Sequence, residues 1–445
     1  MNYDDAVKYI HNISKFGSKL GLQNITELLK RLGDPHTAFP SVHIAGTNGK
    51  GSVSAMIAGM LHQAGYRVGL FISPYLEHFT ERIRVNLKEI PGDDLANLVQ
   101  LIKEKIDGMV EDGFNHPTEF EVVTALGFLW FARQKVDIAV VEVGLGGRLD
   151  ATNVIKPLVS VITSISYDHT RILGSSLSDI AYEKGGIIKP GVPVVSYPQP
   201  AEAEKVIAAL ADKRGCYYHP VTSEQIRVRN DCFSEQHFDF TWKSEIWEDL
   251  IIRLSGRHQQ LNAACALSCI MILKESGFDI PKEAIYAGLK NTRWPGRLEM
   301  ICSNPAILLD GAHNPSGAAV LADTIRQYFS DKQIHLILGV LRDKDVEAVT
   351  GILCSAAHRV TVTRPSNPRA TPPEQLAAIA EKYHSDINIC FNLEEAIEHA
   401  IEWTQEDTVD EKGNSGKRMV IISGSLYLVG EARTILRNKR INTQG

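Results

Sequence analysis

The segment from residue 42 to residue 74 combines residue types that bind phosphate groups. Its sequence, VHIAGTNGKGSVSAMIAGMLHQAGYRVGLFISP, joins an apolar strand, a glycine-rich turn with a lysine, and a run with helical periodicity. Gly46 and Gly49 let backbone amides turn toward an anion, Lys50 adds positive charge, and the positive end of the helix faces the same place. The spacing differs from the common G-x-x-x-x-G-K-[ST] loop, because a further glycine, Gly51, follows Lys50. We expect an unusual nucleotide-binding loop rather than an ordinary strand-to-helix turn.

Polar residues also follow four other apolar segments, at points where strands of a parallel sheet are expected to end. Ligands of such sheets bind at the carboxyl ends of the strands, so these residues are expected near the phosphate loop. Phosphoryl transfer needs Mg²⁺, a hard cation that prefers oxygen ligands, and a carboxylate beside the loop would supply one. The residues are Ser73 after RVGLFI, Glu142 after DIAVV, Asp168 and His169 after VSVITSI, and Asp310 and His313 after AILL.

Three candidate residues also have an ordinary structural interpretation. A single acidic residue at a strand end, such as Glu142, is more often a hydrogen-bonding loop carboxylate, and only its pairing with the phosphate loop favours a metal ligand. His169 alone is a weak candidate, because most histidines lie at the surface or in satisfied core positions. Lys184 is expected near a helix C-terminus, in LSDIAYEKGGIIKPG, where a lysine is usually a solvated charge favoured by the helix dipole.

The chain has 445 residues and a formal net charge of −6, a size that predicts two or three domains. The charge gives no reason to expect nucleic acid, and no uncharged apolar run is long enough for a membrane span. The acidic N-terminal segment MNYDDAVKYIHN is no secretory signal, and seven cysteines without a C-x-x-C pair are typical of reduced thiols. Cys265 and Cys269 are expected to be core residues of an apolar helix rather than metal ligands. We therefore expect a cytoplasmic protein.

Apolar strands alternate with amphipathic helices for most of the length, which is the pattern of an α/β fold. Between about residues 215 and 256 the pattern changes to short alternating runs, QIRVRN, FDFTW and IIRLSG, which predict an antiparallel edge ribbon. The motif WPG then interrupts the helical pattern. We predict a P-loop-type, mostly parallel N-terminal domain at 1–293, a linker at 294–299 and a smaller Rossmann-like domain at 300–445. A charged surface loop is expected at about 406–418.

Motifs along the whole chain resemble those of folylpolyglutamate synthase and its bifunctional form, dihydrofolate synthase, which belong to the Mur-ligase superfamily. They occur in the same order and at similar spacing from the N-terminal SKFGSKLGLQNITELLKRLG to about residue 435. The run from 142 to 191 is highly specific. The motifs are GTNGKGS, SPYLEHFTERIRVN, TEFEVVTALGF, VVEVGLGGRLDATN, SISYDHTRILGSSLSDIAYEKGGIIKPG, GRHQQLNAACAL, WPGRLEMI, LLDGAHNPSGA and ISGSLYLVGEA.

The resemblance implies roles for individual residues. Those implied to bind ATP are Gly49, Lys50, Gly51, Ser52, Asn262, Arg297, Asp310 and His313. Those implied to bind a first Mg²⁺ are Ser73, Glu142 and His169, and Lys184 would be N-carboxylated and contribute to a second Mg²⁺ site. Those implied to contact a pterin-like substrate are Thr118, Glu119, Phe120, Glu121, Leu149, Asp150 and Ala151. Those expected to act in catalysis are Lys50, His169, Lys184 and Arg297.

The activity implied is ATP-dependent ligation of L-glutamate to a folate carboxylate through an acyl phosphate, by a monomer. The acceptor is tetrahydrofolate, dihydropteroate or both. A Mur-type cell-wall amino-acid ligase would share the loop, the magnesium carboxylate and the carboxylated lysine, but Gly51 and the missing N-terminal nucleotide-sugar domain disfavour it. A nucleotide-hydrolysing switch is a third hypothesis, although it gives no reason for Arg297, Asp310 and His313 in a second domain.

Three residues depart from the family's usual motifs. Tyr75 stands where a histidine is common, in SPYL, and Gly186 replaces alanine in EKGGIIK. These two changes are expected to leave ATP and magnesium binding intact. Glu119 occupies a position that is often aromatic, within the implied pterin pocket. Of the properties that the resemblance implies, substrate preference is therefore the one that this residue affects.

Overall fold

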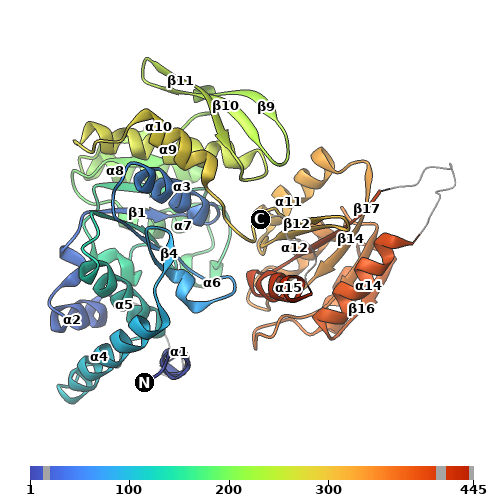
Figure 1. Ribbon diagram of the computed structural model, residues 1–445, viewed down its shortest axis with the longest axis horizontal. Helices are drawn as coiled ribbons and strands as arrows, with labels where there is room; N and C mark the ends of the chain where they lie inside the picture. Colours follow the sequence, from blue (N-terminus) through green and yellow to red (C-terminus); the bar gives the residue numbers. More distant parts are fainter. Residues whose placement is uncertain (14–20, 407–416, 440–445) are drawn as a thin grey trace.

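The computed structural model describes residues 1–13, 21–406 and 417–439 of the chain. Within these ranges the chain forms two large sheets that lie side by side, each covered by helices (Figure 1). A smaller sheet lies above the N-terminal one (Figure 1). Most of the surface loop expected at 406–418 lies outside the described residues.

The larger sheet has eight strands in the order β4-β3-β2-β5-β1-β6-β7-β8. Its strands are β1 (Ser41–Ala45), β2 (Val68–Phe71), β3 (Ile83–Val85), β4 (Lys88–Glu89), β5 (Ile138–Glu142), β6 (Val159–Ile162), β7 (Val194–Ser196) and β8 (Tyr218–Pro220). The helices of this half are α1 (Tyr3–Asn12), α2 (Gln23–Arg31), α3 (Lys50–Gln63), α4 (Gly92–Glu111), α5 (Glu119–Arg133), α6 (Thr170–Leu173), α7 (Leu177–Lys184), α8 (Ala201–Lys213), α9 (His258–Glu275) and α10 (Lys282–Asn291).

The strands at the centre of this sheet are buried along their whole length. Every residue of β1, β5 and β6 is buried, and these strands pair in parallel. Helices cover both faces of such a sheet, which is why the strands are apolar throughout rather than alternating. The predicted parallel α/β architecture is confirmed. Strands β3 and β4 were not predicted, and they add an antiparallel edge beyond β2. Their segment is so rich in charged residues that the alternation of apolar and polar side chains typical of a strand is not evident in it.

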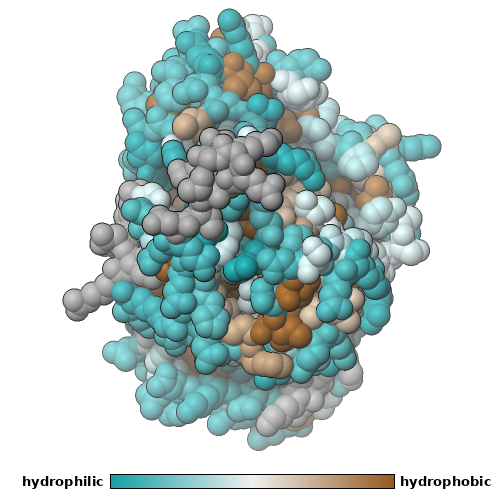
Figure 2. Space-filling model, turned by 90° about the vertical axis from the view of Figure 1, so that its right-hand side faces the viewer, coloured by the Kyte–Doolittle hydropathy of each residue, from teal (hydrophilic) through white to brown (hydrophobic). Residues whose placement is uncertain are grey.

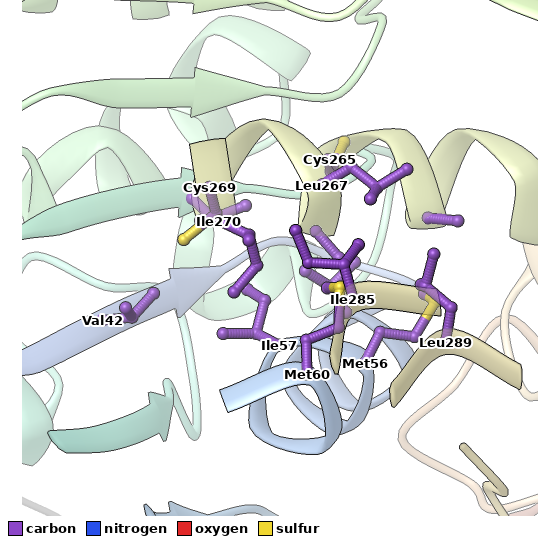
Figure 3. Close-up of a cluster of buried hydrophobic side chains, with 14 of the residues drawn as sticks. Val42, Met56, Ile57, Met60, Cys265, Leu267, Cys269, Ile270, Ile285 and Leu289 are labelled. Atoms are coloured by element: carbon purple, nitrogen blue, oxygen red, sulfur yellow. The ribbon is translucent and has the colours of Figure 1, made fainter. Parts of the chain in front are cut away.

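One face of the sheet is covered by α3, α9 and α10. Their buried side chains meet above β1 in a cluster of aliphatic and sulfur-containing residues (Figure 3). Cys265 and Cys269 belong to this cluster and are fully buried, as predicted for core residues. This packing fixes α3, and therefore the phosphate loop at its N-terminus, against the sheet.

The segment predicted as an edge ribbon forms a separate sheet instead. Strands β9 (Ile226–Asp231), β10 (Gln236–Trp242) and β11 (Glu245–Ile252) pair antiparallel in the order β11-β10-β9. The antiparallel pairing is confirmed, but the position at the edge of the large sheet is wrong. Alternate residues such as Phe238, Phe240 and Trp247 are buried in the cluster that contains α9 and α10, so this sheet packs on helices and not beside β8.

The second large sheet has six strands in the order β12-β13-β17-β14-β15-β16, all parallel except β12. They are β12 (Glu299–Ser303), β13 (Ala306–Asp310), β14 (Lys332–Leu338), β15 (Arg359–Val362), β16 (Ile387–Ile389) and β17 (Lys417–Ser423). The helices are α11 (Pro315–Tyr328), α12 (Val346–Cys354), α13 (Pro373–Ala380), α14 (Leu393–Gln405) and α15 (Leu426–Asn438). The two large sheets fall on either side of residues 294–298, where the linker is predicted.

Candidate active site

The glycine-rich turn lies between β1 and the first turn of α3. Gly49 precedes the helix with φ of +86°, and a Cβ there would lie 2.6 Å from Oδ1 of Asn262. The Lys50 ammonium donates hydrogen bonds to the carbonyl groups of Gly46 at 3.0 Å and Thr47 at 3.2 Å. Burial lowers the pKa of Lys50, while the carboxylates of Glu142 and Asp168 act in the opposite direction. The loop therefore folds around its own lysine.

A cavity of about 410 Å³ opens beside this turn, between the two halves of the molecule. Its walls include the first turns of α3, α9 and α11, an arrangement that favours anions. Every residue predicted for the nucleotide and the metal lines it. These residues are Gly49, Lys50, Gly51, Ser52, Ser73, Glu142, His169, Lys184, Asn262, Arg297, Asp310 and His313.

Ser73 and Glu142 meet at the ends of neighbouring parallel strands, β2 and β5. The Ser73 hydroxyl is buried and has no hydrogen-bond partner among the described residues. Glu142 is 4% exposed; burial raises its pKa to about 7, while Lys50 and Arg297 oppose that rise. An orphaned hydroxyl beside a buried carboxylate fits the oxygen ligands that Mg²⁺ prefers. The described residues contain no group of three or more His, Cys, Asp or Glu side chains that could hold a metal, so such a site would depend on a hydroxyl or a modified side chain.

Lys184 is not the solvated charge that its position near a helix end predicts. It is 4% exposed, and its ammonium donates a 2.9 Å hydrogen bond to the carbonyl of Gly46 in the phosphate loop. Burial lowers its pKa to about 7, and the nearby charge of Lys50 acts in the same direction. The ordinary interpretation of this residue is therefore wrong, because the fold carries the last turn of α7 under the loop rather than to the surface.

Asp168 and His169 follow β6 and contact residues of the other half of the molecule. The Lys344 ammonium lies 2.7 Å from Asp168 Oδ1 and 3.0 Å from His169 Nε2. Asn314 donates to Asp168 Oδ2 at 3.1 Å, and His313 Nε2 lies 3.6 Å from the same oxygen. Burial alone would raise the pKa of Asp168, but His313 and Lys344 outweigh it and lower that pKa; burial lowers the pKa of His169 to about 4.

Arg297 and Asp310 lie where the linker meets the second sheet. Both oxygens of Asp310 accept backbone hydrogen bonds, from Leu298 and from Ala312, each at 2.9 Å. Arg297 donates to the carbonyl of Gly311 at 3.2 Å and lines the cavity. Asp310 therefore shapes the linker directly, and the Arg297 guanidinium faces the same cavity as Lys50.

A second cavity of about 390 Å³ adjoins the first. The two share the wall formed by Ser73, Pro74 and the start of the GLGG turn. Most of the residues predicted to contact a pterin line the second cavity: Thr118, Phe120, Glu121, Leu149, Asp150 and Ala151. A ligand that filled it would reach the phosphate side at Ser73.

Glu119 does not line either cavity, in contrast to its neighbours. Its carboxylate points to His11 of α1, with Oε1 3.3 Å from the imidazole Nδ1. Glu119 is the first residue of α5, so its side chain diverges from those of Phe120 and Glu121. The departure at this position therefore lies outside the cavity wall.

The other two unusual residues have visible packing partners. A Cβ at Gly186 would lie 2.4 Å from the Cα of Arg148, so the missing methyl group allows these two backbone segments to touch. Tyr75 packs against Phe79 with ring centroids 5.9 Å apart, and the guanidinium of Arg82 lies 5.1 Å from the Tyr75 ring.

Several residues at or beside the site were not predicted from the sequence. Lys344 and Asn314 come from the second half of the chain, and only the folded arrangement brings them to Asp168, which lines the first cavity. The first cavity also has an apolar and aromatic side, formed by residues such as Tyr197, Pro198 and His258. Their positions could have indicated them, because Tyr197 and Pro198 directly follow β7 and His258 begins α9.

Two domains of the Mur ligases match this chain. The Mur ligase middle domain matches residues 44–270, and the Mur ligase glutamate ligase domain matches residues 296–426. The two α/β halves of this chain, with the phosphate loop at their junction, are thus the two domains of an ATP-dependent ligase of the Mur type.

More specific relatives match nearly the whole chain. The dihydrofolate synthase/folylpolyglutamate synthase of Bacillus subtilis is 37% identical over 98% of this chain and 99% of its own length. Mycobacterium tuberculosis folylpolyglutamate synthase, solved in complex with ADP, superposes with a TM-score of 0.90 at 33% identity, covering 97% of this chain and 98% of that one. The E. coli FolC structure with DHPP and ADP has a TM-score of 0.84 at 27% identity, with 98% of each chain covered. This chain belongs to the folylpolyglutamate synthase/dihydrofolate synthase family.

Proposed function

We propose that this enzyme joins L-glutamate to a carboxylate of tetrahydrofolate, of dihydropteroate or of both, and that ATP activates the carboxylate as an acyl phosphate. The observation that carries the proposal is the meeting of two cavities at Ser73. One has the phosphate loop in its wall, and the other has a volume of about 390 Å³ and a largely apolar lining, which suits an aromatic acceptor. Two substrates entering from opposite sides would place a phosphate and a carboxylate in contact there.

ATP would occupy the first cavity. Its phosphates would lie against the backbone amides at 49–52 and the Lys50 ammonium, which would leave the loop carbonyls that it now contacts. The base would lie toward Tyr197 and His258, with Asn262 beside Gly49. Support comes from relatives of the same fold, whose structures contain ADP.

Residues at the strand ends beside the phosphate loop would hold two Mg²⁺ ions. Ser73, Glu142 and His169 would hold one, and an N-carboxylated Lys184 would contribute to the other. Lys184 suits carboxylation because CO₂ reacts with a neutral amine, and burial favours that form at neutral pH. When bound, Mg²⁺ would neutralise charge on the phosphate oxygens.

The side chains of the cavity then have defined roles in the reaction. Lys50 and Arg297, from opposite halves of the molecule, would stabilise the charge that spreads over the transferring phosphoryl group. The acceptor carboxylate oxygen attacks the γ-phosphorus and ADP leaves. The glutamate amine next attacks the acyl carbon, loses a proton, and expels phosphate. The contacts from Asp168 to Asn314 and Lys344 would hold the halves together and exclude water from the acyl phosphate.

The acceptor would enter the second cavity with its pterin ring toward Phe120, Leu149 and Ala151. Glu121 and Asp150 are held by backbone amides: Glu121 accepts from Thr118 at 2.7 Å and Asp150 from Leu145 at 2.8 Å. These carboxylates therefore keep the shape of the pocket. The DHPP complex of the E. coli relative supports a pterin-type ligand in this family.

We further propose a cytoplasmic monomer. All seven cysteines are free thiols, which suits a reducing compartment. No helix among the described residues is long and apolar enough to cross a membrane. On the face formed by the second half of the chain, hydrophilic residues cover most of the coloured surface and hydrophobic ones gather in small separate areas (Figure 2).

The experiment that tests this function measures ADP release with each substrate omitted in turn. A ligase requires both the folate acceptor and L-glutamate for sustained turnover, whereas a nucleotide switch hydrolyses ATP without either. A cell-wall ligase would ignore folates and accept a nucleotide-sugar acceptor. Parallel assays with dihydropteroate and tetrahydrofolate as acceptors decide which of the two folate reactions this enzyme performs.

A further inference from the structure

The second cavity is lined by one cation, Arg82, that forms no ion pair with any described residue. Arg82 ends a short 3-10 turn (Phe79–Arg82) directly before β3, and its Nε is buried without a hydrogen-bond partner among the described residues. Its guanidinium lies against two aromatic rings, 5.1 Å from the centre of Tyr75 and 5.3 Å from that of Phe79. The guanidinium thus rests against two rings, while its Nε has no acceptor among the described residues.

The other charged side chains of this cavity are already paired or hydrogen-bonded. Arg148 donates to Glu183 at 2.8 Å. Glu121 caps α5 and also accepts from the backbone of α2, and Asp150 accepts from Leu145. Arg82 is therefore different from every other ionisable group in this wall.

Burial lowers the pKa of Arg82, and the negative charge of Glu119 acts in the opposite direction without forming an ion pair with the guanidinium. The Glu119 carboxylate lies 3.3 Å from His11, and no ion pair joins it to Arg82 within the described ranges. Arg82 is partly buried, and a guanidinium withdrawn from water without an anionic partner is unfavourable, so a bound anion would stabilise it. Planar N–H donors match a carboxylate in particular.

We propose that Arg82 binds the α-carboxylate of a glutamyl group already attached to the acceptor, and so makes the enzyme selective for glutamylated folates over pteroates. The inference rests on the proposed function. The γ-carboxylate of such an acceptor has to reach Ser73, where the two cavities meet, and the α-carboxylate lies a few bonds away in the same cavity. Arg82 and Ser73 both line that cavity. Dihydropteroate has one carboxylate, which reacts, and thus leaves Arg82 without this partner.

A matched pair of ligands tests the proposal. Dihydrofolate and dihydropteroate differ only by the glutamyl group, and their dissociation constants can be measured by calorimetry with Mg²⁺ and a non-hydrolysable ATP analogue. Arg82→Met keeps an unbranched, flexible side chain, although a shorter one, and removes the charge. We expect it to weaken dihydrofolate binding by about 10- to 100-fold, the range of a charge-assisted hydrogen bond, and dihydropteroate binding by less than about threefold. Arg82→Lys should recover part of the loss.

Arg148→Met is the matched control, because it removes an arginine of the same cavity that Glu183 already engages. It should leave the ratio of the two dissociation constants unchanged. Equal weakening of both ligands by Arg82→Met would overturn the proposal, as would no weakening of either. A raised KM for free L-glutamate with unchanged acceptor binding would also overturn it and assign Arg82 to the incoming amino acid. Failure of the wild-type enzyme to bind either ligand would contradict the proposed function instead.

Discussion

The Lys344 ammonium lies 2.7 Å from the Asp168 carboxylate, and this ion pair joins the two halves of the molecule. The side chains are 8% and 10% exposed, so water screens the pair little. Asn314 donates to the same Asp168 carboxylate, and His169 lies 3.0 Å from the Lys344 ammonium. A buried charge pair thus spans the junction of the two halves, with Asp168 in the wall of the first cavity.

Removal of this pair should slow catalysis. Lys344→Met leaves the buried Asp168 carboxylate without its cation, which favours the separated arrangement of the two halves. We expect kcat to fall at least about tenfold, since closure aligns the reacting groups, and the radius of gyration in solution scattering to rise. Lys382→Met is the control, because Lys382 pairs with Glu347 in a largely exposed position of the same half. An unchanged kcat in Lys344→Met would refute the role of the pair in closure.

Lys50→Ala should abolish ATP turnover. The loop would keep its backbone, but the transferring phosphoryl group would lose its nearest protein cation, a loss of order 10²-fold or more in kcat. Steady-state ADP release measures this. Lys205→Ala, at an exposed position of α8, should behave as the wild type. Unchanged turnover in Lys50→Ala would remove the phosphate-loop assignment.

Lys184→Ala tests the carbamate. We expect nearly complete loss of activity and partial rescue by small carboxylates such as acetate or formate, which would occupy the place of the missing carbamate oxygens. Chloride at equal ionic strength controls for a salt effect. A second readout is the carbamate carbon of the wild-type enzyme in ¹³C NMR after incubation with ¹³C-bicarbonate, a signal that Lys184→Ala should lack. Wild-type activity of the variant without added carboxylate would exclude the carbamate.

The stability of the N-terminal half should depend on the protonation of His43. This histidine is fully buried in β1, its Nε2 lies 2.8 Å from Thr152 Oγ1, and burial lowers its pKa from 6.5 to about 3. Between these two values His43 is protonated in the unfolded chain but neutral in the folded chain. The contribution of the neutral His43 to the free energy of unfolding is therefore complete above pH 6.5 and is lost as the pH falls toward 3. The loss is up to about 1.4 kcal/mol per pH unit.

Urea unfolding between pH 7 and pH 4 checks this expectation. His43→Asn should show a shallower fall in the free energy of unfolding than the wild type. Identical slopes in the two proteins would show that His43 does not titrate in this way.

The sequence predicted the features that depend on local patterns. The loop at 46–52 was recognisable because its glycines and lysine are neighbours in the chain. Ser73 and Glu142 followed from the rule that parallel strands share one ligand-binding edge. The antiparallel pairing of the three-stranded sheet was predicted, but its position was not. Strands with alternating apolar residues can bury their apolar face either at a sheet edge or against helices, and the sequence pattern is the same in both cases.

Features that depend on distant contacts were not predictable. Lys184 has the local sequence of a solvated helix end, and only the passage of α7 beneath the phosphate loop buries it. Lys344 and Asn314 acquire their roles by meeting Asp168 across more than a hundred residues of chain. The sequence also does not show that Arg82 lacks an ion-pair partner among the described residues. This depends on which partners the neighbouring charged side chains contact in the folded chain.

The formation of an acyl phosphate is the central claim, and oxygen transfer tests it most directly. The reactive carboxylate of the acceptor is labelled with ¹⁸O, the enzyme is supplied with ATP and L-glutamate, and the released phosphate is analysed by mass spectrometry. The carboxylate oxygen that attacks the γ-phosphorus leaves with phosphate when the amine displaces it, so one labelled oxygen should appear in phosphate for each amide bond formed. Phosphate without label, released at the rate of product formation, would contradict the mechanism.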